Sequence, residues 1–349
     1  MLPIPASLGA ITDEWLSAAL DQPVTGHRVV DAHAGTTGRG VIALSCEEGV
    51  TLPERLFVKL PPDDAAQHLF VTTSGMGRRE ALFYEQLSDE VPLRVPRNYY
   101  AVSNASGDEY IMLMEHLEDS GCTFRNASTA KASGESMDYI KRVLAAFARL
   151  HAAYWNTPRF KQDLAWIDPL MQQGIAAQLV TRALQQHGAA LPTVFSDMAE
   201  LYLGETDAVH RLWREGDVTL VHGDAHDGNL FMHGREPGFL DWAVLARAPG
   251  MRDVGYFLAA TVEEGERDAL PELMCYYRQQ LQAGGVSAPS EQLLWQQLQW
   301  HATYVWLSAT VTLAMGDDWQ PQRYTLSALE KIHGAIEHLQ CVSAIRDAL

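Results

Sequence analysis

The hydrophobic pattern of this 349-residue chain changes once, near residues 115–120. Before that point, short apolar segments rich in β-branched and aromatic residues alternate with glycine and proline, a pattern typical of strands and turns. Beyond it, apolar residues recur every three or four positions over long segments, which indicates amphipathic helices. A chain of this length has enough residues for two hydrophobic cores. We therefore predict an α+β protein with two lobes, residues 1–116 and residues 117–349.

The first lobe is predicted to hold an antiparallel sheet and one central helix. A short helix comes before the sheet, from Thr12 to Leu20, with Thr12 as its N-cap and two acidic residues in its first turn. Pro61 and Pro62 end the third expected strand, because proline cannot donate to a sheet ladder. The expected strands are residues 27–34, 41–46, 55–60, 99–102 and 110–114, and the central helix is residues 77–87.

The second lobe is predicted to be mainly helical. Segment 292–316 has no Asp, Glu, Lys or Arg, but polar residues interrupt its first half, and the remaining apolar run is shorter than the roughly 20 residues that a bilayer requires. We therefore expect a buried helix there and no membrane span. The expected long helices are residues 137–155, 193–213, 292–315 and 324–341, and a compact β region covers residues 218–222, 229–232 and 238–241.

Charge and cysteine content exclude several classes of protein. Lys and Arg total 26 against 44 Asp and Glu, and the formal net charge of −18 would repel phosphate-rich surfaces. We therefore expect no nucleic-acid partner and no anionic membrane. The four cysteines form no C-x-x-C pair, so neither a disulfide framework nor a zinc site is indicated. Without the pattern of a signal peptide, this cysteine usage favours a cytoplasmic protein.

The most informative segment is Val221–Phe231, in the compact β region. It places Asp224 and Asn229 at the spacing Asp-x-x-x-x-Asn, and Asp241 follows one short hairpin later. Phosphoryl transfer needs a carboxylate that orients the attacking hydroxyl and accepts its proton, together with oxygen ligands for magnesium. Asp224 suits the first role, and Asn229 and Asp241 suit the second.

The first lobe offers a cation for nucleotide phosphates and a carboxylate to hold that cation. Lys59 ends a predicted strand and is the only lysine among the first 130 residues. Glu80, Phe83 and Leu87 share one helix face because they lie three and seven positions apart, whereas Glu85 falls on the opposite side. Glu80 is therefore the expected inward carboxylate. Either residue alone would more often be an exposed surface charge, so the pair is evidence for a phosphate site only together with Asp224, Asn229 and Asp241.

Three glycines, Gly35, Gly38 and Gly40, lie between two predicted strands. A dinucleotide fingerprint would lie between a strand and a helix instead. Since glycine lets a backbone approach a ligand closely, this placement suits a flap over nucleotide phosphates.

In order along the chain, these motifs resemble the landmarks of the aminoglycoside phosphotransferase, choline kinase and ecdysteroid-kinase-like superfamily, which is related to the protein kinases. The resemblance covers about residues 25–345. It implies a bilobal protein-kinase-like fold that uses ATP and Mg²⁺, with a nucleotide-binding first lobe and a second lobe that holds the catalytic loop and the acceptor site. The segments that carry the resemblance are residues 57–61, 79–84, 112–115, 150–155, 222–229 and 239–242.

The resemblance also implies roles for single residues. Lys59 would contact the α- and β-phosphates and pair with Glu80, and Asp224 would be the catalytic base. Asn229 and Asp241 would hold magnesium. The other implied positions are the backbone of Glu115, His116 and Leu117, which would receive adenine, the loop of Gly35, Gly38 and Gly40, which would cover the phosphates, and Asp253, which would brace the catalytic loop.

Two other functions explain part of the pattern. The cluster of His222, Asp224, His226 and Asp227 is reminiscent of the ligand sets of metal-dependent hydrolases, but that function leaves Lys59 unexplained. A non-catalytic nucleotide-binding protein on the same fold is the second alternative, although every position needed for transfer carries a competent side chain. We predict a kinase that moves the γ-phosphate of ATP to a hydroxyl of a small-molecule acceptor, for which the sequence holds no diagnostic motif.

Overall fold

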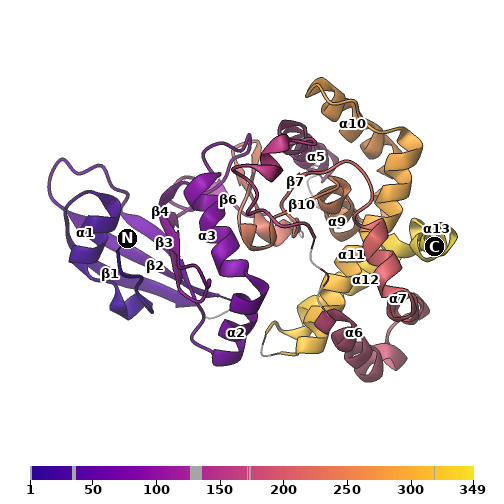
Figure 1. Ribbon diagram of the computed structural model, residues 1–349, viewed down its shortest axis with the longest axis horizontal. Helices are drawn as coiled ribbons and strands as arrows, with labels where there is room; N and C mark the ends of the chain where they lie inside the picture. The colour runs from indigo at the N-terminus through magenta and orange to yellow at the C-terminus, as the bar shows by residue number, and fades with distance from the viewer. Residues whose placement is uncertain (1, 34–36, 126–135, 171, 173, 318) are drawn as a thin grey trace. The chain divides into compact units, whose positions relative to one another are not determined.

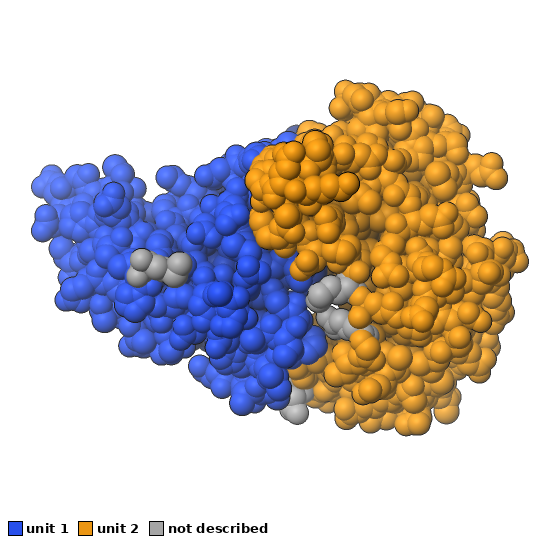
Figure 2. Space-filling model, viewed as in Figure 1, with its two compact units in different colours: residues 1–125, 230–245 blue, residues 126–229, 246–349 orange. Residues whose placement is uncertain are grey.

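The structure is a computed structural model that describes residues 2–33, 37–125, 136–170, 172, 174–317 and 319–349. The chain divides into two compact units (Figure 2). The first unit comprises Met1–Arg125 and Leu230–Leu245, and the second comprises Asn126–Asn229 and Ala246–Leu349. Residues 1–116 therefore all lie in the first unit, whereas residues 117–349 contribute to both.

A five-stranded antiparallel sheet forms the frame of the first unit (Figure 1). In its register, Lys59 lies opposite Arg39 on one neighbouring strand and opposite Met112 on the other. Paired residues in a sheet share a face, and successive residues alternate between faces. These three side chains are therefore on one face, and Val58 is on the other. The strand order is β1 (Val24–His33), β2 (Gly38–Cys46), β3 (Arg55–Leu60), β5 (Tyr110–Glu115) and β4 (Asn98–Ser103).

One face of this sheet packs against α1 (Asp13–Leu20). The Thr12 hydroxyl accepts a hydrogen bond from the backbone N–H of Trp15 at 3.1 Å, which confirms the predicted N-cap. Apolar residues of α1 form one buried core with alternate strand residues such as Leu56 and Val58. Because this face is apolar, the polar chemistry of the unit belongs to the opposite face.

The opposite face is covered by α3 (Met76–Gln86), which follows α2 (Ala65–Ser74) and packs on β4 and β5. Gly77 allows a close approach between α3 and the sheet, since a Cβ at this position would lie 2.0 Å from the ring of Tyr110. The helix backbone is therefore held near the face of the sheet that carries Lys59.

A second, three-stranded sheet joins residues 230–245 to the first unit. In it, β6 (Cys122–Thr123) pairs with β8 (Leu230–His233), and β8 pairs with β9 (Glu236–Phe239). Gly234 adopts a positive φ of 61° in the turn between β8 and β9, a conformation that favours glycine. This hairpin places Asp241 in the first unit.

Helices make up most of the second unit, where α11 (Glu291–Met315) packs against α6 (Gly174–His187), α9 (Met251–Thr261) and α12 (Gln322–His338) (Figure 1). Strand β7 (Thr219–Val221) comes before the segment with the candidate catalytic residues, and β10 (Ala246–Ala248) comes after it. The two strands pair as a small antiparallel sheet. The other helices are α5 (Ser136–Ala153), α6 (Gly174–His187), α7 (Thr193–Gly204), α8 (Thr206–Leu212), α9 (Met251–Thr261), α10 (Leu270–Ala283), α12 (Gln322–His338) and α13 (Cys341–Ala348).

The predicted α+β class is confirmed, with an antiparallel sheet in the N-terminal region and a helical C-terminal region. The prediction of one helix over residues 193–213 is wrong, because the chain forms α7 and α8 with a break at Glu205. Glycine disfavours a helix interior, and Gly204 ends α7. The expected helix over residues 324–341 also ends early, since Gln340 adopts a left-handed conformation.

Helix α11 confirms the expected buried helix. Leu298 and Trp306 are fully buried on it, and its N-cap Ser290 accepts a hydrogen bond from Leu293. Within the part of the chain that the structure describes, the helices lack the combination of length and apolar character that crossing a membrane requires.

The core of the second unit holds three buried histidines whose neutral form is favoured. Burial lowers the pKa of His301 to about 3, with help from the charge of Arg252, and lowers the pKa values of His210 and His333 to about 4. Each folded-state pKa is below the value of about 6.5 expected in the unfolded chain. The unfolded chain therefore binds more protons below pH 6.5, and stability is lost as the pH falls from there toward 4 and 3.

We predict that the melting temperature decreases when the pH is lowered from 7.5 to 5. His301 alone should account for a loss of roughly 2 kcal/mol in the free energy of unfolding over this range. Replacing this histidine removes its proton uptake, so His301→Gln should give a flatter pH dependence. His338 is exposed on α12, and His338→Gln should keep the pH dependence of the wild type. Equal slopes for all three proteins in a series of melting curves would contradict the prediction.

Candidate active site

A buried lysine between two carboxylates is the central feature of the first unit. The Nζ atom of Lys59 lies 2.5 Å from Oε2 of Glu80 and 2.9 Å from Oδ1 of Asp241. The Lys59 and Glu80 side chains are 5% and 1% exposed, whereas Asp241 is 24% exposed. The structure thus brings together three of the predicted site residues from β3, α3 and the segment after β9.

Helix α3 presents the face that the sequence predicted. Glu80, Phe83 and Leu87 are buried, and Glu85 is exposed. The 3.6-residue period of the helix explains this division, since positions three and seven apart return to the same side. Glu80 is therefore aimed at the sheet, where Lys59 of β3 lies.

Two contacts from α3 hold the chain around Asp241. The Phe83 ring stacks on the Trp242 ring, with centroids 4.1 Å apart and planes at 11°. Arg79 donates a hydrogen bond from Nη1 to the carbonyl of Ala243 at 2.9 Å. Asp241 itself has a φ of 63°, which is uncommon outside glycine and tends to occur at functional positions. One helix thus carries the first carboxylate of the cluster and anchors the second.

The charges in this cluster depend on one another. Burial raises the pKa of Glu80 to about 7, with Lys59 opposing the change and Asp241 adding to it. Burial alone would lower the pKa of Lys59, but the carboxylates of Asp241 and Glu80 raise it above its ordinary value. Lys59 therefore remains a cation in a site that is almost closed to water.

Two other predicted residues meet in the second unit, on the loop after β7. The side-chain amide of Asn229 donates to the backbone carbonyl of Asp224 at 2.9 Å and to its carboxylate Oδ2 at 3.1 Å. Because the amide nitrogen makes both bonds, the amide oxygen of Asn229 points away from Asp224. The Asp224 side chain is 33% exposed, so its carboxylate is partly open to solvent.

Asp253 of α9 braces the start of this loop, as the resemblance implied. Its two carboxylate oxygens accept hydrogen bonds from the backbone N–H groups of His222 and Gly223, each at 2.8 Å. His151 of α5 lies against the same carboxylate, with Nε2 3.3 Å from Oδ2. All of these side chains are fully buried, so the loop is fixed to the helical core.

Neighbouring groups keep Asp224 ionised. Burial would raise its pKa, but the nearby imidazole of His226 and a hydrogen bond from Tyr256 hold the pKa of Asp224 well below its usual range. The Nε2 atom of His226 is 3.6 Å from the Asp224 carboxylate, and its Nδ1 accepts a hydrogen bond from Gly228. His226 is thus hydrogen-bonded within the loop.

The candidate magnesium ligands fit the chemistry of that ion. Asp241 offers a partly exposed carboxylate, and Asn229 offers the oxygen of an amide whose nitrogen is already engaged. Magnesium prefers oxygen ligands and keeps several positions for water and phosphate, so few protein ligands are needed. Among the described residues, no group of three or more His, Cys, Asp or Glu side chains is arranged to hold a metal.

The structure gives Gly38 and Gly40 a packing role in β2. A Cβ on Gly38 would lie 2.7 Å from the carbonyl oxygen of Pro61, and one on Gly40 would lie 2.5 Å from the side chain of Leu8. Gly38 therefore leaves no room for a side chain against the backbone of Pro61, whereas a side chain at Gly40 would require Leu8 to move. Gly35, the third predicted glycine, lies outside the described residues.

The segment predicted to receive adenine forms the end of β5 and a turn. The Glu115 carboxylate pairs with Arg94 at 2.5 Å and accepts from the backbone N–H of Arg97 at 2.9 Å. The carbonyls of His116 and Leu117 accept hydrogen bonds within the turn. The Glu115 side chain thus has a structural partner, and the adenine role of this backbone stays a prediction.

Sequence reasoning missed Arg39, which lies between Gly38 and Gly40. Its Nη2 atom is 3.8 Å from Oδ2 of Asp241, and it lies opposite Lys59 in the sheet. Its position in the sequence could have indicated this role. Arg39 lies on the strand that follows the predicted glycine loop, and that strand pairs with the strand of Lys59.

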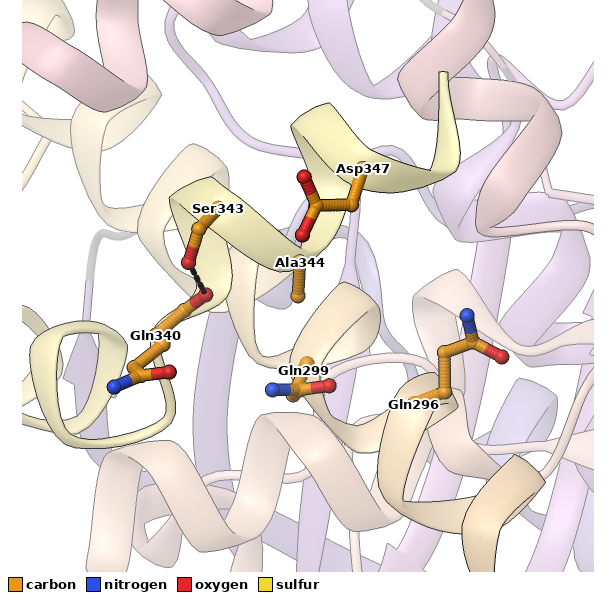
Figure 3. Close-up of a pocket in the computed structure, with 6 residues that line it drawn as sticks. All are labelled: Gln296, Gln299, Gln340, Ser343, Ala344 and Asp347. Carbon is orange, nitrogen blue, oxygen red and sulfur yellow. Dashed lines mark hydrogen bonds between the residues drawn. The ribbon is translucent and has the colours of Figure 1, made fainter.

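A pocket of about 220 Å³ lies elsewhere in the second unit, between α11 and the C-terminal helix α13 (Figure 3). None of the predicted site residues lines it. Its lining residues are Gln296, Gln299, Gln340, Ser343, Ala344 and Asp347.

A sequence model described as "Phosphotransferase enzyme family" matches residues 47–285, which is more than half of the chain. The protein therefore belongs to the phosphotransferase enzyme family. This result confirms the resemblance drawn from the motifs. No curated protein matches the sequence.

Solved structures of small-molecule kinases share the fold. A GDP complex of a variant of aminoglycoside 2′-phosphotransferase-IIIa is 12% identical with a TM-score of 0.53, over 92% of this chain and 96% of that chain. A choline/ethanolamine kinase family protein from Mesorhizobium loti is 15% identical with a TM-score of 0.52, over 93% and 94% of the two chains. A choline kinase from Cryptosporidium parvum is 12% identical with a TM-score of 0.52, over 98% and 94%. The TM-scores show a shared fold, and at these low identities the similarity shows nothing further.

We predict that Lys59→Met lowers the free energy of unfolding by about 3 kcal/mol, because it leaves Glu80 buried without its cation. The double variant Lys59→Met/Glu80→Gln removes both charges and should recover most of the loss. The check is a double-mutant cycle in denaturant. Additive losses in the cycle would show that the two side chains do not stabilise the fold as a pair.

Proposed function

We propose that this protein is an ATP-dependent phosphotransferase that moves the γ-phosphate of ATP to a hydroxyl of a small molecule. The observation that carries the proposal is the buried Lys59 held by Glu80 and Asp241, together with membership of the phosphotransferase enzyme family. A buried cation beside a partly exposed carboxylate is suited to a polyphosphate and its metal ion.

In the second unit, Asp224 would act as the base. It would orient the acceptor hydroxyl and take its proton as the acceptor oxygen forms a bond to the γ-phosphorus and ADP leaves. The hydrogen bond from Asn229, which orients the carboxylate, and the contact with His226, which helps to keep it ionised, support this role. The brace from Asp253 fixes the backbone on which Asp224 lies.

In the first unit, Lys59 would bind the α- and β-phosphates, and Glu80 would hold its side chain in place. Asp241 and Asn229 would hold Mg²⁺. When bound, the ion neutralises phosphate charge. The remaining proposed contacts with the nucleotide are the backbone of Glu115, His116 and Leu117 for adenine and the segment of Gly35, Gly38 and Gly40 near the phosphates.

The same reasoning assigns nucleotide binding to residues 1–116 and acceptor binding to residues 117–349. The cysteine usage supports a cytoplasmic location. Among the structural relatives, one is described as a complex of an aminoglycoside phosphotransferase with gentamicin, and another is described as a choline kinase. Both acceptors carry a hydroxyl, which is the group that the Asp224 chemistry requires.

The hydrolase alternative has less support. His222 is fully buried, and its Nδ1 accepts the backbone N–H of Asp224 at 3.3 Å. Asp227 accepts a hydrogen bond from Tyr139 at 3.0 Å. His222 is thus engaged within the loop and Asp227 by α5, whereas metal-dependent hydrolysis needs both side chains as ligands.

We predict that ATP with Mg²⁺ raises the midpoint of thermal unfolding more than ATP alone, because only the native state binds the nucleotide. Asp241→Asn should abolish the contribution of Mg²⁺, and titration calorimetry with and without the ion would measure the loss. An equal effect of Mg²⁺ in the wild type and the variant would show that Asp241 does not bind the ion. No response to ATP at all would sink the proposed function.

A second prediction concerns the base. Asp224→Asn should reduce acceptor-dependent ADP formation by about 100-fold or more while leaving ATP affinity nearly unchanged. The measurement is a coupled ADP assay over aminoglycosides, amino alcohols, sugars and hydroxylated lipids. The matched variant Asp227→Asn separates the alternatives, since a kinase tolerates it and a hydrolase that uses this residue as a ligand does not. ATP binding without ADP formation on any acceptor would favour the non-catalytic alternative.

A further inference from the structure

Two cations face each other across neighbouring strands in the first unit. Arg39 of β2 and Lys59 of β3 are direct partners in the antiparallel register, so both side chains project from the same face of the sheet. Like charges in such a pair are destabilising, and the buried Lys59 has little water to screen it. An arrangement of this kind requires a negatively charged partner.

Asp241 is a negatively charged partner of both cations, but it lies closer to Lys59 than to Arg39. The Asp241 carboxylate lies 2.9 Å from Nζ of Lys59, through Oδ1, and 3.8 Å from Nη2 of Arg39, through Oδ2. The shorter distance is a charge-assisted hydrogen bond, whereas the longer one is only an ion pair. Arg39 therefore has hydrogen-bonding capacity that Asp241 does not use.

Exposure separates the two cations further. The Arg39 side chain is 38% exposed, while Lys59 is 5% exposed. The guanidinium of arginine presents donors in a planar fork that matches a phosphate group. Arg39 is thus the accessible cation of the pair, next to a lysine that is almost closed to water.

The backbone of Arg39 is also held in place. Gly38 and Gly40 flank it in β2, where the carbonyl oxygen of Pro61 and the side chain of Leu8 lie close to the two glycines. Its Nε atom donates to the hydroxyl of Thr37 at 3.3 Å. Fixing the backbone reduces the entropy that a ligand contact would cost.

We propose that Arg39 is a second phosphate-binding residue, which contacts the phosphates of the bound nucleotide from β2 alongside Lys59. This inference rests on the proposed function, because it adds a residue to the nucleotide site of the kinase. In this arrangement Asp241 lies near both cations before the nucleotide binds, while Glu80 also pairs with Lys59, and the phosphates become the partner of Arg39 afterwards. The glycines on either side serve the packing of the strand, and the side chain between them recognises the ligand.

The test compares ATP with adenosine, which lacks phosphates. Titration calorimetry with Mg²⁺ on the full chain would measure both ligands for the wild type, Arg39→Gln and Arg39→Lys. Losing a charge-assisted phosphate contact should weaken ATP binding by about tenfold or more in Arg39→Gln. Adenosine affinity should stay unchanged, and Arg39→Lys should recover part of the ATP affinity because it keeps the charge.

Arg28 supplies the matched control, since it is an exposed arginine on β1 of the same sheet. Arg28→Gln should bind ATP as the wild type does, and the melting temperature of each variant would verify folding. Unchanged ATP affinity in Arg39→Gln, or an equal loss for ATP and adenosine, would overturn the inference while the proposed function stands. If the wild type itself binds no ATP, the proposed function fails and this inference fails with it.

Discussion

A buried positive charge organises the first unit. Taking a lysine out of water costs several kcal/mol unless carboxylates and hydrogen bonds replace the lost hydration. Lys59 obtains those partners from Glu80 and Asp241, which are far from it in the sequence. The fold must therefore place α3 against the sheet and return the chain after β9 to the same point.

The surrounding contacts satisfy this requirement. Gly77 lets α3 approach the sheet, and the stacked rings of Phe83 and Trp242 hold the segment that carries Asp241. The short sheet of β6, β8 and β9 ties residues 230–245 to the unit. A chain segment that follows the loop of Asp224 thus packs with the unit that holds Lys59. In the second unit, Asp253 has the corresponding role, because its carboxylate fixes the backbone before Asp224.

Much of the candidate site could be predicted because its signals are local. The helical period separated Glu80 from Glu85, and the Asp-x-x-x-x-Asn spacing placed Asp224 and Asn229 on one loop, where they are hydrogen-bonded. The break at Glu205 was missed, since residues 193–213 keep an apolar period across it. Arg39 was missed for a different reason, because its partner strand and its distance from Asp241 depend on tertiary structure.

The sequence by itself determined the α+β class, the helix face that carries Glu80 and the order of the motifs, because periodicity and spacing are properties of adjacent residues. Only the tertiary structure decided which unit each motif joins. Residues 230–245 pack with the first unit, although the sequence placed them in the helical lobe. The tertiary structure also decided that Gly38 packs closely against the backbone of Pro61 and that Arg39 lies opposite Lys59, because both depend on strand pairing between segments that the local pattern does not connect.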